Sequence, residues 1–459
     1  MKRAGSRAAV TLSIVALLLA PNVAAAQTAG LTKADLLVVG GTPAGVAAAL
    51  TAARDGETVT LVSAKDDLGG TLTDAMMDQW DLNVGPNGAL LQAGIFGEIY
   101  ARLGDVFTPS NAANTLAGMV AAEPRITVRY DEVPVRVQTA LEREGLRVAA
   151  VTFAGAGDGV LETLRAPFVI DATDAGDVAA LAGARYDVGR QDTGIDERTQ
   201  AVTELFTLGG VDWPGLARSY DVERYGPGGV VERRAWGYTE VMRAYRPAFA
   251  DIVVRDLNLG LQPDGAVTVN AIDVCGIDGL DRTQLDDAKR QTELEAPRLV
   301  AYLRDRLPGF QDARVGIFAP DVYVRETRHI EGLERLTASD VWFGRIPPNS
   351  IGLSSYPLDL HPVDPTDEPA YAPERHVYGI PFGALVPKGF TNLLLASPAI
   401  SASHVASGSA RVIPTTIEEG EADGHASAIA LRRDETFLDL ALRPSAVAIG
   451  RTISTLRRA

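Results

Sequence analysis

The chain has 459 residues, of which 46% are hydrophobic and 22% are charged, as in a globular protein of one or two domains. Its formal net charge of −16 disfavours nucleic acid as a partner, because an acidic surface repels phosphate backbones. The single cysteine, Cys275, excludes an internal disulfide and a CxxC redox pair, and we expect a buried, inert thiol.

The first residues have the pattern of a signal peptide. Basic residues within the first seven positions precede an apolar run over 8–20, and three alanines end at Ala26. The run is too short for an ordinary membrane span, and no later segment reaches that length. We therefore expect a signal peptide over 1–26, cleaved after Ala26, an exported (periplasmic or extracellular) protein and no stable membrane insertion.

The next segments predict a β-α-β unit. Residues 34–39 form an apolar strand pattern that ends in glycines, 43–54 an alanine-rich helix, and 57–62 a strand rich in valine and threonine. This order predicts an α/β fold with a parallel sheet.

Further elements divide the chain. Strand patterns follow over 128–137, 146–153, 167–170 and 392–396, and helical patterns over 177–182 and 418–432. Between 183 and 388 the composition shifts towards Trp, Tyr, Pro and charge, which indicates a discontinuous nucleotide-binding domain with an inserted α+β substrate region. The expected parts are the signal peptide (1–26), the N-terminal part of the nucleotide-binding domain (34–185), the substrate region (186–389), the C-terminal part (390–432) and a helical tail (433–459).

The segment Gly40-Gly41-Thr42-Pro43-Ala44-Gly45 lies between a strand and a helix, as a dinucleotide fingerprint must. Gly40 permits a tight turn and Gly45 permits close packing of helix on strand. The first amides of the helix then face a pyrophosphate, aided by the helix dipole. Thr42 replaces the usual middle glycine, which narrows the approach but offers a hydroxyl that can donate to phosphate.

Two further turns are candidates for contact with the ligand. The second strand ends at Ser63, where an acid normally binds the ribose, so Asp66 and Asp67 are possible substitutes. The turn that contains Gly69, Gly70 and Thr71 suits a backbone that runs close to a ligand, although an ordinary turn is the alternative.

Later segments add small and polar residues. In the turn 171–177, Asp177 either caps the following helix or binds ligand hydroxyls. Near the C-terminus, Ser403-His404 and Gly408-Ser409-Ala410-Arg411 precede a helix whose early Gly420 permits close approach to a ligand.

Together these segments resemble the FAD-dependent oxidoreductase family that has a glutathione-reductase-like FAD-binding domain. That family's patterns are GGxPAG, LGG, a DATGDGD-like turn, NLLxAG, SHxAxGSxR and GQAxGxAAA, and the resemblance runs from about 34 to 432. It implies a Rossmann-like domain that binds FAD non-covalently, because the second and the C-terminal motifs are not part of a simple nicotinamide dehydrogenase domain. This sequence departs from the family pattern at Thr42, Ser63, Asp174, Ser397 and Glu421.

The resemblance implies pyrophosphate at 40–45 and the ribityl chain near Asp177. The implied cofactor-binding residues are Gly40, Gly41, Thr42, Pro43, Ala44, Gly45, Ser63, Gly69, Gly70, Thr71, Asp177, Gly408, Arg411 and Gly420.

Three residues are candidates for catalysis. His404 lies in the segment expected to line the isoalloxazine ring, and His361 lies in a loop-like stretch; either can act as acid or base beside a flavin, or be structural. Arg325 can stabilise anionic reduced flavin or bind a substrate carboxylate, with an interface salt bridge as the alternative. The same alternatives apply to Arg411. The histidines do not have metal-ligand spacing, so no metal site is expected.

The predicted reaction is hydride transfer between the carbon of a small organic substrate, hydroxylated or sugar-like, and flavin N5, with His404 or His361 moving the proton. A reductase of an activated double bond is the alternative enzyme. A non-catalytic binding protein is the alternative of another class, and Thr42 and Ser63 support it. A nicotinamide-only dehydrogenase leaves the C-terminal motifs unexplained. The electron acceptor is unknown: oxygen, a quinone and a small redox protein all remain open.

Overall fold

The computed structural model describes residues 34–155, 159–367, 370–372 and 375–442. The expected signal peptide over 1–26 and most of the expected tail over 433–459 lie outside the described residues.

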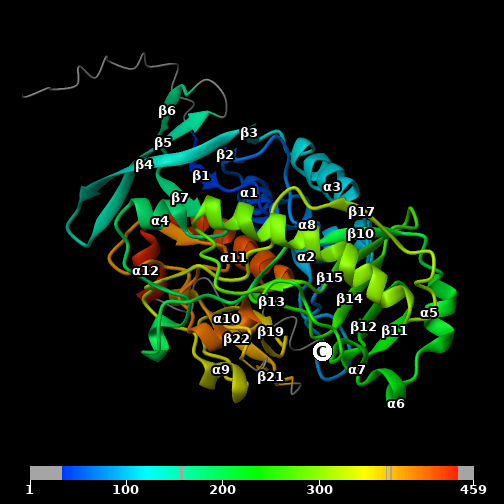
Figure 1. Cartoon of the computed structure of the whole chain (residues 1–459). Helices are drawn as coiled ribbons and strands as arrows, with labels where there is room; N and C mark the ends of the chain where they lie inside the picture. Colours follow the sequence, from blue (N-terminus) through cyan, green and yellow to red (C-terminus); the bar gives the residue numbers. More distant parts are fainter. Residues whose placement is uncertain (1–33, 156–158, 368–369, 373–374, 443–459) are drawn as a thin grey trace, which may run out of the picture. The chain divides into compact units, whose positions relative to one another are not determined.

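A five-stranded parallel sheet lies in the part of the chain for which nucleotide binding is expected (Figure 1). Its strand order is β23-β7-β1-β2-β3. In register, Leu36 of β1 is paired with Val59 of β2 and with Phe168 of β7. All residues of β1, β2, β7 and β23 are buried, as expected for parallel strands covered on both faces. The bounds are β1 Leu36–Val39, β2 Val59–Val62, β3 Ile126–Arg129, β7 Phe168–Asp171 and β23 Leu393–Leu395.

This sheet confirms the predicted α/β fold class. Its strand β23 follows β7 by more than 200 residues along the chain and yet pairs with it, from Leu393 opposite Val169 to Leu395 opposite Asp171. The sheet is therefore discontinuous in sequence, as predicted.

Two helices pack closely beside the sheet. A Cβ atom added to Gly420 of α11 would lie 2.1 Å from the carbonyl oxygen of Ala44 in α1, so only glycine permits this approach. Helix α1 is drawn in blue and α11 in orange in Figure 1. The helices of this part are α1 Pro43–Arg54, α2 Gly94–Leu103, α3 Pro109–Ala121, α4 Asp177–Leu181, α10 His404–Ala410, α11 Ile413–Arg433 and α12 Phe437–Leu442.

The single strand predicted over 128–137 is wrong. Asp131 has a left-handed backbone with φ of 57°, which turns the chain after β3. The following β4 (Glu132–Leu141) leaves the parallel sheet and forms an antiparallel meander with β5 (Leu146–Gly155) and β6 (Leu161–Leu164).

The middle region has its own antiparallel sheet and core. Its six strands run in the order β11-β12-β14-β15-β10-β17. Leu299, Val300 and Leu303 of the long helix α8 are buried in the same core as Phe206 and Leu259 of this sheet. The bounds are β10 Phe206–Gly209, β11 Gly229–Val231, β12 Arg234–Gly237, β14 Leu257–Leu261, β15 Val267–Asn270, β17 Arg314–Phe318 and α8 Arg282–Arg304.

Short elements complete the described chain: β8 Tyr186–Val188, β9 Val202–Thr203, β13 Ile252–Val253, β16 Asp273–Val274, β18 Arg328–Ile330, β19 Ser350–Ser354, β20 Leu358–Leu360, β21 Ala370–Ala372, β22 Tyr378–Pro381, α5 Trp213–Ser219, α6 Val222–Tyr225, α7 Thr239–Met242, α9 Ala338–Trp342, and the 3₁₀ turns η1 Gly70–Leu72, η2 Gly189–Thr193 and η3 Phe382–Ala384. Within the described ranges, none of the helices combines the length and the apolar character needed to cross a membrane.

Candidate cofactor and active site

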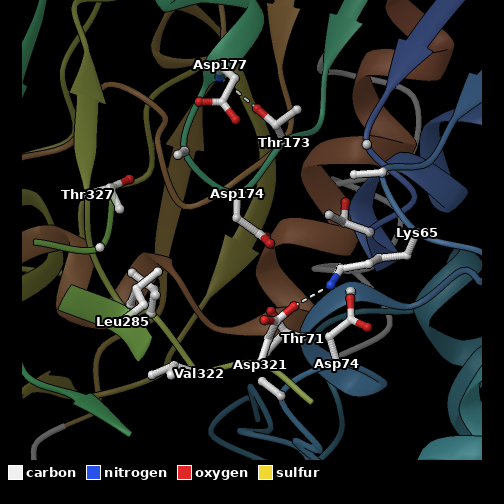
Figure 2. A pocket seen from close by; sticks show the side chains of 18 of the residues that line it. Lys65, Thr71, Asp74, Thr173, Asp174, Asp177, Leu285, Asp321, Val322 and Thr327 are labelled. Atoms are coloured by element: carbon white, nitrogen blue, oxygen red, sulfur yellow. Dashed lines mark hydrogen bonds and ion pairs between the residues drawn. The ribbon is translucent and has the colours of Figure 1, made fainter. Parts of the chain in front are cut away.

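A cavity of about 370 Å³, called the large cavity below, opens at the carboxyl ends of β1, β2 and β7. The turns that follow these strands line it through 40–42, 63–65 and 173–175. The start of α8 and the segment 321–327 of the middle region line its other side (Figure 2). Ligands of open α/β sheets bind at this edge.

The glycine-rich turn has the predicted close contacts. Gly40 has φ of 122°, and a Cβ atom there would lie 2.3 Å from the Ala172 carbonyl oxygen. A Cβ atom on Gly45 would lie 2.0 Å from the Gly40 carbonyl oxygen. The turn therefore requires glycine at both positions.

Thr42 has a different role from the one predicted. Its Oγ1 accepts a hydrogen bond from the Gly45 amide at 3.1 Å, which caps α1, and donates to the Ala172 carbonyl oxygen at 3.0 Å. The hydroxyl proton is therefore not available to a phosphate. In the described part of the chain the Ala44 amide makes no hydrogen bond, so this first-turn donor remains for an anion.

Ser63 shapes the turn after β2. Its hydroxyl donates to the Asp67 carbonyl oxygen at 2.8 Å and accepts from the Lys65 amide at 3.2 Å, so it cannot also donate to a ribose. Of the two substitutes left open by the sequence, Asp67 lines the large cavity, and its buried Oδ1 has no partner among the described residues. Burial raises the pKa of this carboxyl.

The second glycine turn lies against the first. The Gly69 amide donates to the Gly41 carbonyl oxygen at 2.8 Å, and a Cβ atom on Gly70 would lie 3.4 Å from Thr42 Cγ2. Gly70 and Thr71 line the large cavity beside Thr42. Gly70 and Thr71 are therefore placed where a ligand could contact them, and this contact stays a prediction.

Asp177 is the first residue of α4, and Gly176 occupies the capping position, so the predicted cap is wrong. The Asp177 carboxylate lines the large cavity and accepts a hydrogen bond from Arg328 Nη1 at 2.7 Å. Its proposed contact with the ribityl chain therefore competes with this ion pair.

Gly408 and Gly420 pack helices and do not line either cavity described here. A Cβ atom on Gly408 would lie 2.8 Å from Leu360 Cδ2, and Gly420 is in contact with α1. Both residues are needed for close approach between protein segments, and their predicted contact with the cofactor stays a prediction.

A second cavity of about 20 Å³, called the small cavity below, continues from the first. Both cavities are lined by Thr42, Thr71 and Asp174. The small cavity extends to Ser397, to Arg411 and to the start of α11. The two cavities together follow an extended path from Lys65 to Arg411.

A buried ionic cluster lies at the Arg411 end of this path. Arg325, 2% exposed, donates from Nη1 to the Ala201 carbonyl oxygen and to Thr203 Oγ1, both at 2.8 Å. Its Nη2 lies 3.4 Å from Asp273 Oδ1, and its guanidinium carbon lies 4.9 Å from the centre of the Tyr323 ring. The Tyr323 hydroxyl in turn accepts a hydrogen bond from Arg411 Nη1 at 2.8 Å.

His361 belongs to the same cluster. Its Nδ1 lies 2.8 Å from Asp273 Oδ2, and its Nε2 lies 3.7 Å from Asp359 Oδ2. Asp359 also pairs with Arg411 at 3.5 Å. The two aspartates therefore bring together three candidates, Arg325, His361 and Arg411, that are far apart in the sequence.

The cluster favours the protonated form of His361. Burial and Arg325 lower its pKa, but Asp273 and Asp359 outweigh them, and the pKa is raised above its ordinary value. Burial alone would raise the pKa of Asp273, yet His361 and Arg325 lower it to about 2. Nearby, burial raises the pKa of Asp256 to about 6 and also raises that of Asp81, which accepts a hydrogen bond from Tyr356.

His404 lies in a second buried network, which Gln200 joins to His361, and it lines neither cavity. Its Nδ1 lies 2.7 Å from Glu326 Oε1, and His329 Nε2 lies 2.8 Å from the same oxygen. Burial would raise the pKa of Glu326, but its bonds to His329 and His404 lower it to about 2. Because Glu326 follows Arg325 in the chain, this network fixes the segment that carries Arg325, and a direct role for His404 stays a proposal.

A family model described as "FAD dependent oxidoreductase" matches residues 35–449. The chain belongs to the FAD-dependent oxidoreductase family. FAD is therefore its cofactor, and the chain is an enzyme of the oxidoreductase class.

Three solved structures are among those similar to this chain. The p-nitrophenol 4-monooxygenase of Pseudomonas putida DLL-E4 is 13% identical with a TM-score of 0.47, over 93% of this chain and 89% of that one. A geranylgeranyl bacteriochlorophyll reductase-like protein of Thermoplasma acidophilum is 13% identical with a TM-score of 0.43, over 93% and 91%. A flavoprotein/dehydrogenase of Cytophaga hutchinsonii is 14% identical with a TM-score of 0.42, over 88% and 80%. A search among curated proteins found no match.

The residues of the extended path fit this cofactor. The Ala44 amide at the start of α1 is available to a pyrophosphate, and the unpartnered Asp67 Oδ1 to an adenosine ribose. At the other end, the buried Nε atoms of Arg325 and Arg411 have no partner among the described residues. When bound, FAD would supply the redox chemistry, and these residues would supply orientation and charge.

Sequence reasoning missed Asp273 and Asp359. Asp273 lies in the two-residue strand β16, and Asp359 lies in the three-residue strand β20. Neither belongs to a motif, and only the fold reveals that they flank His361. The buried Cys275 thiol agrees with the sequence analysis, and burial raises its pKa to about 12.

Proposed function

We propose that this enzyme transfers hydride between a small hydroxylated substrate and FAD at the His361 cluster, defined as Arg325, His361, Arg411, Asp273 and Asp359. The carrying observation is that Arg325 and Arg411 line the small cavity next to the start of α11 and are linked through Asp273 and Asp359 to His361, which lies behind them and lines neither cavity. Groups that both donate and accept hydrogen bonds suit a substrate rich in hydroxyl groups, such as a sugar or a hydroxy acid.

The chain's own groups have separable roles in this proposal. Arg325 and Arg411 orient the substrate and offset negative charge that develops during the reaction. His361 exchanges the hydroxyl proton, and Asp273 fixes the orientation of the imidazole through Nδ1. Arg325 and Asp273 are already paired, so the site is organised before the substrate arrives.

We also propose that the protein acts outside the cytoplasm. The support is the basic and apolar pattern of residues 1–26. The measurement is the N-terminal residue of the protein recovered from the producing cells, with Gln27 expected. An intact N-terminus on the active protein would contradict export by this route.

Anaerobic titration of the flavin absorbance tests the proposed reaction. The FAD-loaded chain from Gln27 onward is mixed with a panel of sugars and hydroxy acids, and one compound is expected to bleach the flavin. Peroxide formed when air is admitted would identify an oxidase. If no compound bleaches the flavin but reduced enzyme transfers electrons to an activated double bond, the enzyme is instead a reductase. A flavin that takes part in neither reaction would favour the non-catalytic binding protein.

A further inference from the structure

Two carboxyl groups line the cofactor cavity. Asp174 lies in the turn after β7, with an exposed side chain that opens into both the large and the small cavity. Asp74 lies just after the 3₁₀ turn η1, with a half-buried side chain in the large cavity. Figure 2 shows Asp174 reaching from one wall towards Lys65, with Asp74 close by. Neither residue has a place in the reaction proposed above.

Both carboxyls share their space with the start of α1. Asp174 lines the small cavity together with Thr42, Pro43 and Ala44, the N-terminal residues of that helix. Asp74 lines the large cavity together with the glycine turn over 40–42. Because the helix start attracts an anion, the FAD pyrophosphate is expected in a cavity whose wall already contains two carboxyls. Two ionised carboxylates beside a pyrophosphate would repel it.

The cations of the cavity already have protein partners. Lys65 Nζ lies 2.5 Å from Asp321 Oδ2, and Arg282 Nη1 lies 3.0 Å from Asp321 Oδ1 (Figure 2 draws the first pair). Lys289 lies 3.8 Å from Glu204, and Arg325 lies 3.4 Å from Asp273. The remaining acids that line the large cavity are Asp67, Asp177, Asp286 and Glu326. No histidine lines the large or the small cavity.

We propose that Asp174 and Asp74 face the cofactor as neutral carboxylic acids, so that FAD binding takes up protons. A protonated carboxyl donates a hydrogen bond to a phosphate oxygen, whereas a carboxylate only accepts. A bridging metal ion is the other way to bring carboxylates and phosphates together. In the described part of the chain, no group of three or more metal-ligating side chains could hold such an ion.

The raised pKa values of the two acids agree with this proposal. Although the Asp174 side chain is accessible to solvent inside the cavity, the protein atoms of the cavity wall shield it from bulk water, and this shielding, with a contribution from Asp177, raises its pKa to about 6. Burial also raises the pKa of Asp74 to about 7, although Lys65 opposes this, while Asp67, Asp321 and Asp174 contribute to it. An adjacent pyrophosphate raises both pKa values further, because it penalises the ionised form. The bound state therefore carries more protons than the free state, and FAD affinity falls as pH rises.

The test uses the apoprotein and FAD alone, so it does not depend on the substrate. The dissociation constant of FAD is measured by flavin fluorescence at pH 6 and pH 8, and we expect it to be at least about tenfold higher at pH 8. Calorimetry at pH 7 in two buffers of different ionisation enthalpy gives the number of protons that the protein exchanges with the buffer on binding FAD. We expect a net uptake of protons. A dissociation constant that does not rise with pH, with no proton uptake, would overturn the proposal.

Variants and a metal chelator sharpen the test. Asp174→Asn and Asp74→Asn keep a hydrogen-bond donor without a titrating group, so each should bind FAD more tightly at pH 8 and flatten the pH dependence. Asp305 is exposed beyond the end of α8 and lies outside both cavities, so Asp305→Asn should leave the pH dependence of FAD binding unchanged. Loss of binding in EDTA, restored by Mg²⁺, would overturn the proposal in favour of a bridging cation. If a variant fails to fold, the number of protons taken up by the unmodified protein on FAD binding still tests the proposal.

Discussion

At the scale of single residues, Asp273 connects the two groups on which the proposed chemistry depends. It pairs with His361 at 2.8 Å through one oxygen and lies 3.4 Å from Arg325 through the other. Removing its charge leaves a buried guanidinium without its carboxylate.

Asp273→Asn should therefore destabilise the fold by about 3–5 kcal/mol, the usual cost of breaking a buried ion pair from one side. The measurement is urea unfolding followed by circular dichroism. Asp55→Asn is the matched control, because Asp55 pairs with His425 at a partly exposed site and should lose about 1 kcal/mol or less. Equal losses in the two variants would contradict the buried pairing.

The pH dependence of the reaction rate should follow the titration of the His361 imidazole. Its pKa is raised by Asp273 and Asp359, and the imidazole can donate a proton below that pKa and accept one above it. If the physiological reaction is oxidation of a hydroxyl, flavin reduction should speed up as pH rises through this pKa. If it is reduction of a double bond, the rate should fall over the same range. Stopped-flow rates across pH 6 to 9 measure this, and a flat profile that His361→Gln leaves unchanged would remove His361 from the proton transfer.

Residue roles that depend on local geometry could be predicted from the sequence, and roles that depend on distant pairing could not. Gly40 and Gly45 follow from the strand-turn-helix pattern, because the turn itself needs them. The hydrogen bond from Thr42 to the Ala172 carbonyl oxygen was not predicted, because these residues become neighbours only in the fold. The bond from Ser63 to the Asp67 carbonyl oxygen is local, but the sequence pattern does not specify the conformation of that turn. Asp273 and Asp359 had no local signal at all.

At the scale of elements, the contact between α1 and α11 positions the cofactor turn. Gly420→Ala would place a methyl group 2.1 Å from the Ala44 carbonyl oxygen, so one helix must move. We expect a loss of about 1–3 kcal/mol of stability and weaker FAD binding, because the start of α1 shifts with the helix.

Gly118→Ala is the control for that substitution. Gly118 lies in α3 with nothing within 4 Å of an added Cβ atom, so alanine should stabilise the helix by up to about 1 kcal/mol. Thermal unfolding and FAD titration of both variants check the pair. A Gly420→Ala protein that behaves like Gly118→Ala would show that the helices do not need this close contact.

Elements with strong periodicity were predicted well. The helix over 43–54 was predicted with the bounds that the structure gives, because Thr42 caps it and Pro43 starts it. The predicted helix over 418–432 begins earlier, at Ile413, where Pro414 suits the first turn. Helix α10 was not predicted as a helix, since its serine and glycine content lacks an apolar stripe. Strands of two to five residues in the middle region are too short for periodicity to reveal.

At the scale of the whole molecule, buried carboxyls should make the protein most stable in mild acid. Burial raises the pKa of Glu57, Asp78 and Asp171 to about 7 and that of Glu204 to about 8. In the unfolded chain these groups ionise near pH 4, so the folded state binds more protons between about pH 4 and 8. Stability is therefore lost as pH rises through that range.

The apoprotein should accordingly have a lower Tm at pH 8 than at pH 5, as measured by differential scanning calorimetry. Below about pH 4 the trend reverses, because the lowered pKa values of Asp273 and Glu326 make their ion pairs sensitive to acid. A Tm that climbs steadily from pH 5 to pH 8 would contradict the raised pKa values of the buried carboxyls.

The most direct test of the proposed active site is the rate of flavin reduction in a single turnover. The first substrate that bleaches the flavin is mixed anaerobically with the unmodified enzyme, with His361→Gln and with His425→Gln, whose histidine pairs with Asp55 away from both cavities. The account predicts that all three proteins hold FAD, and that only His361→Gln loses about 10²-fold or more in rate. Equal rates in His361→Gln and the unmodified enzyme would contradict it and place the chemistry elsewhere.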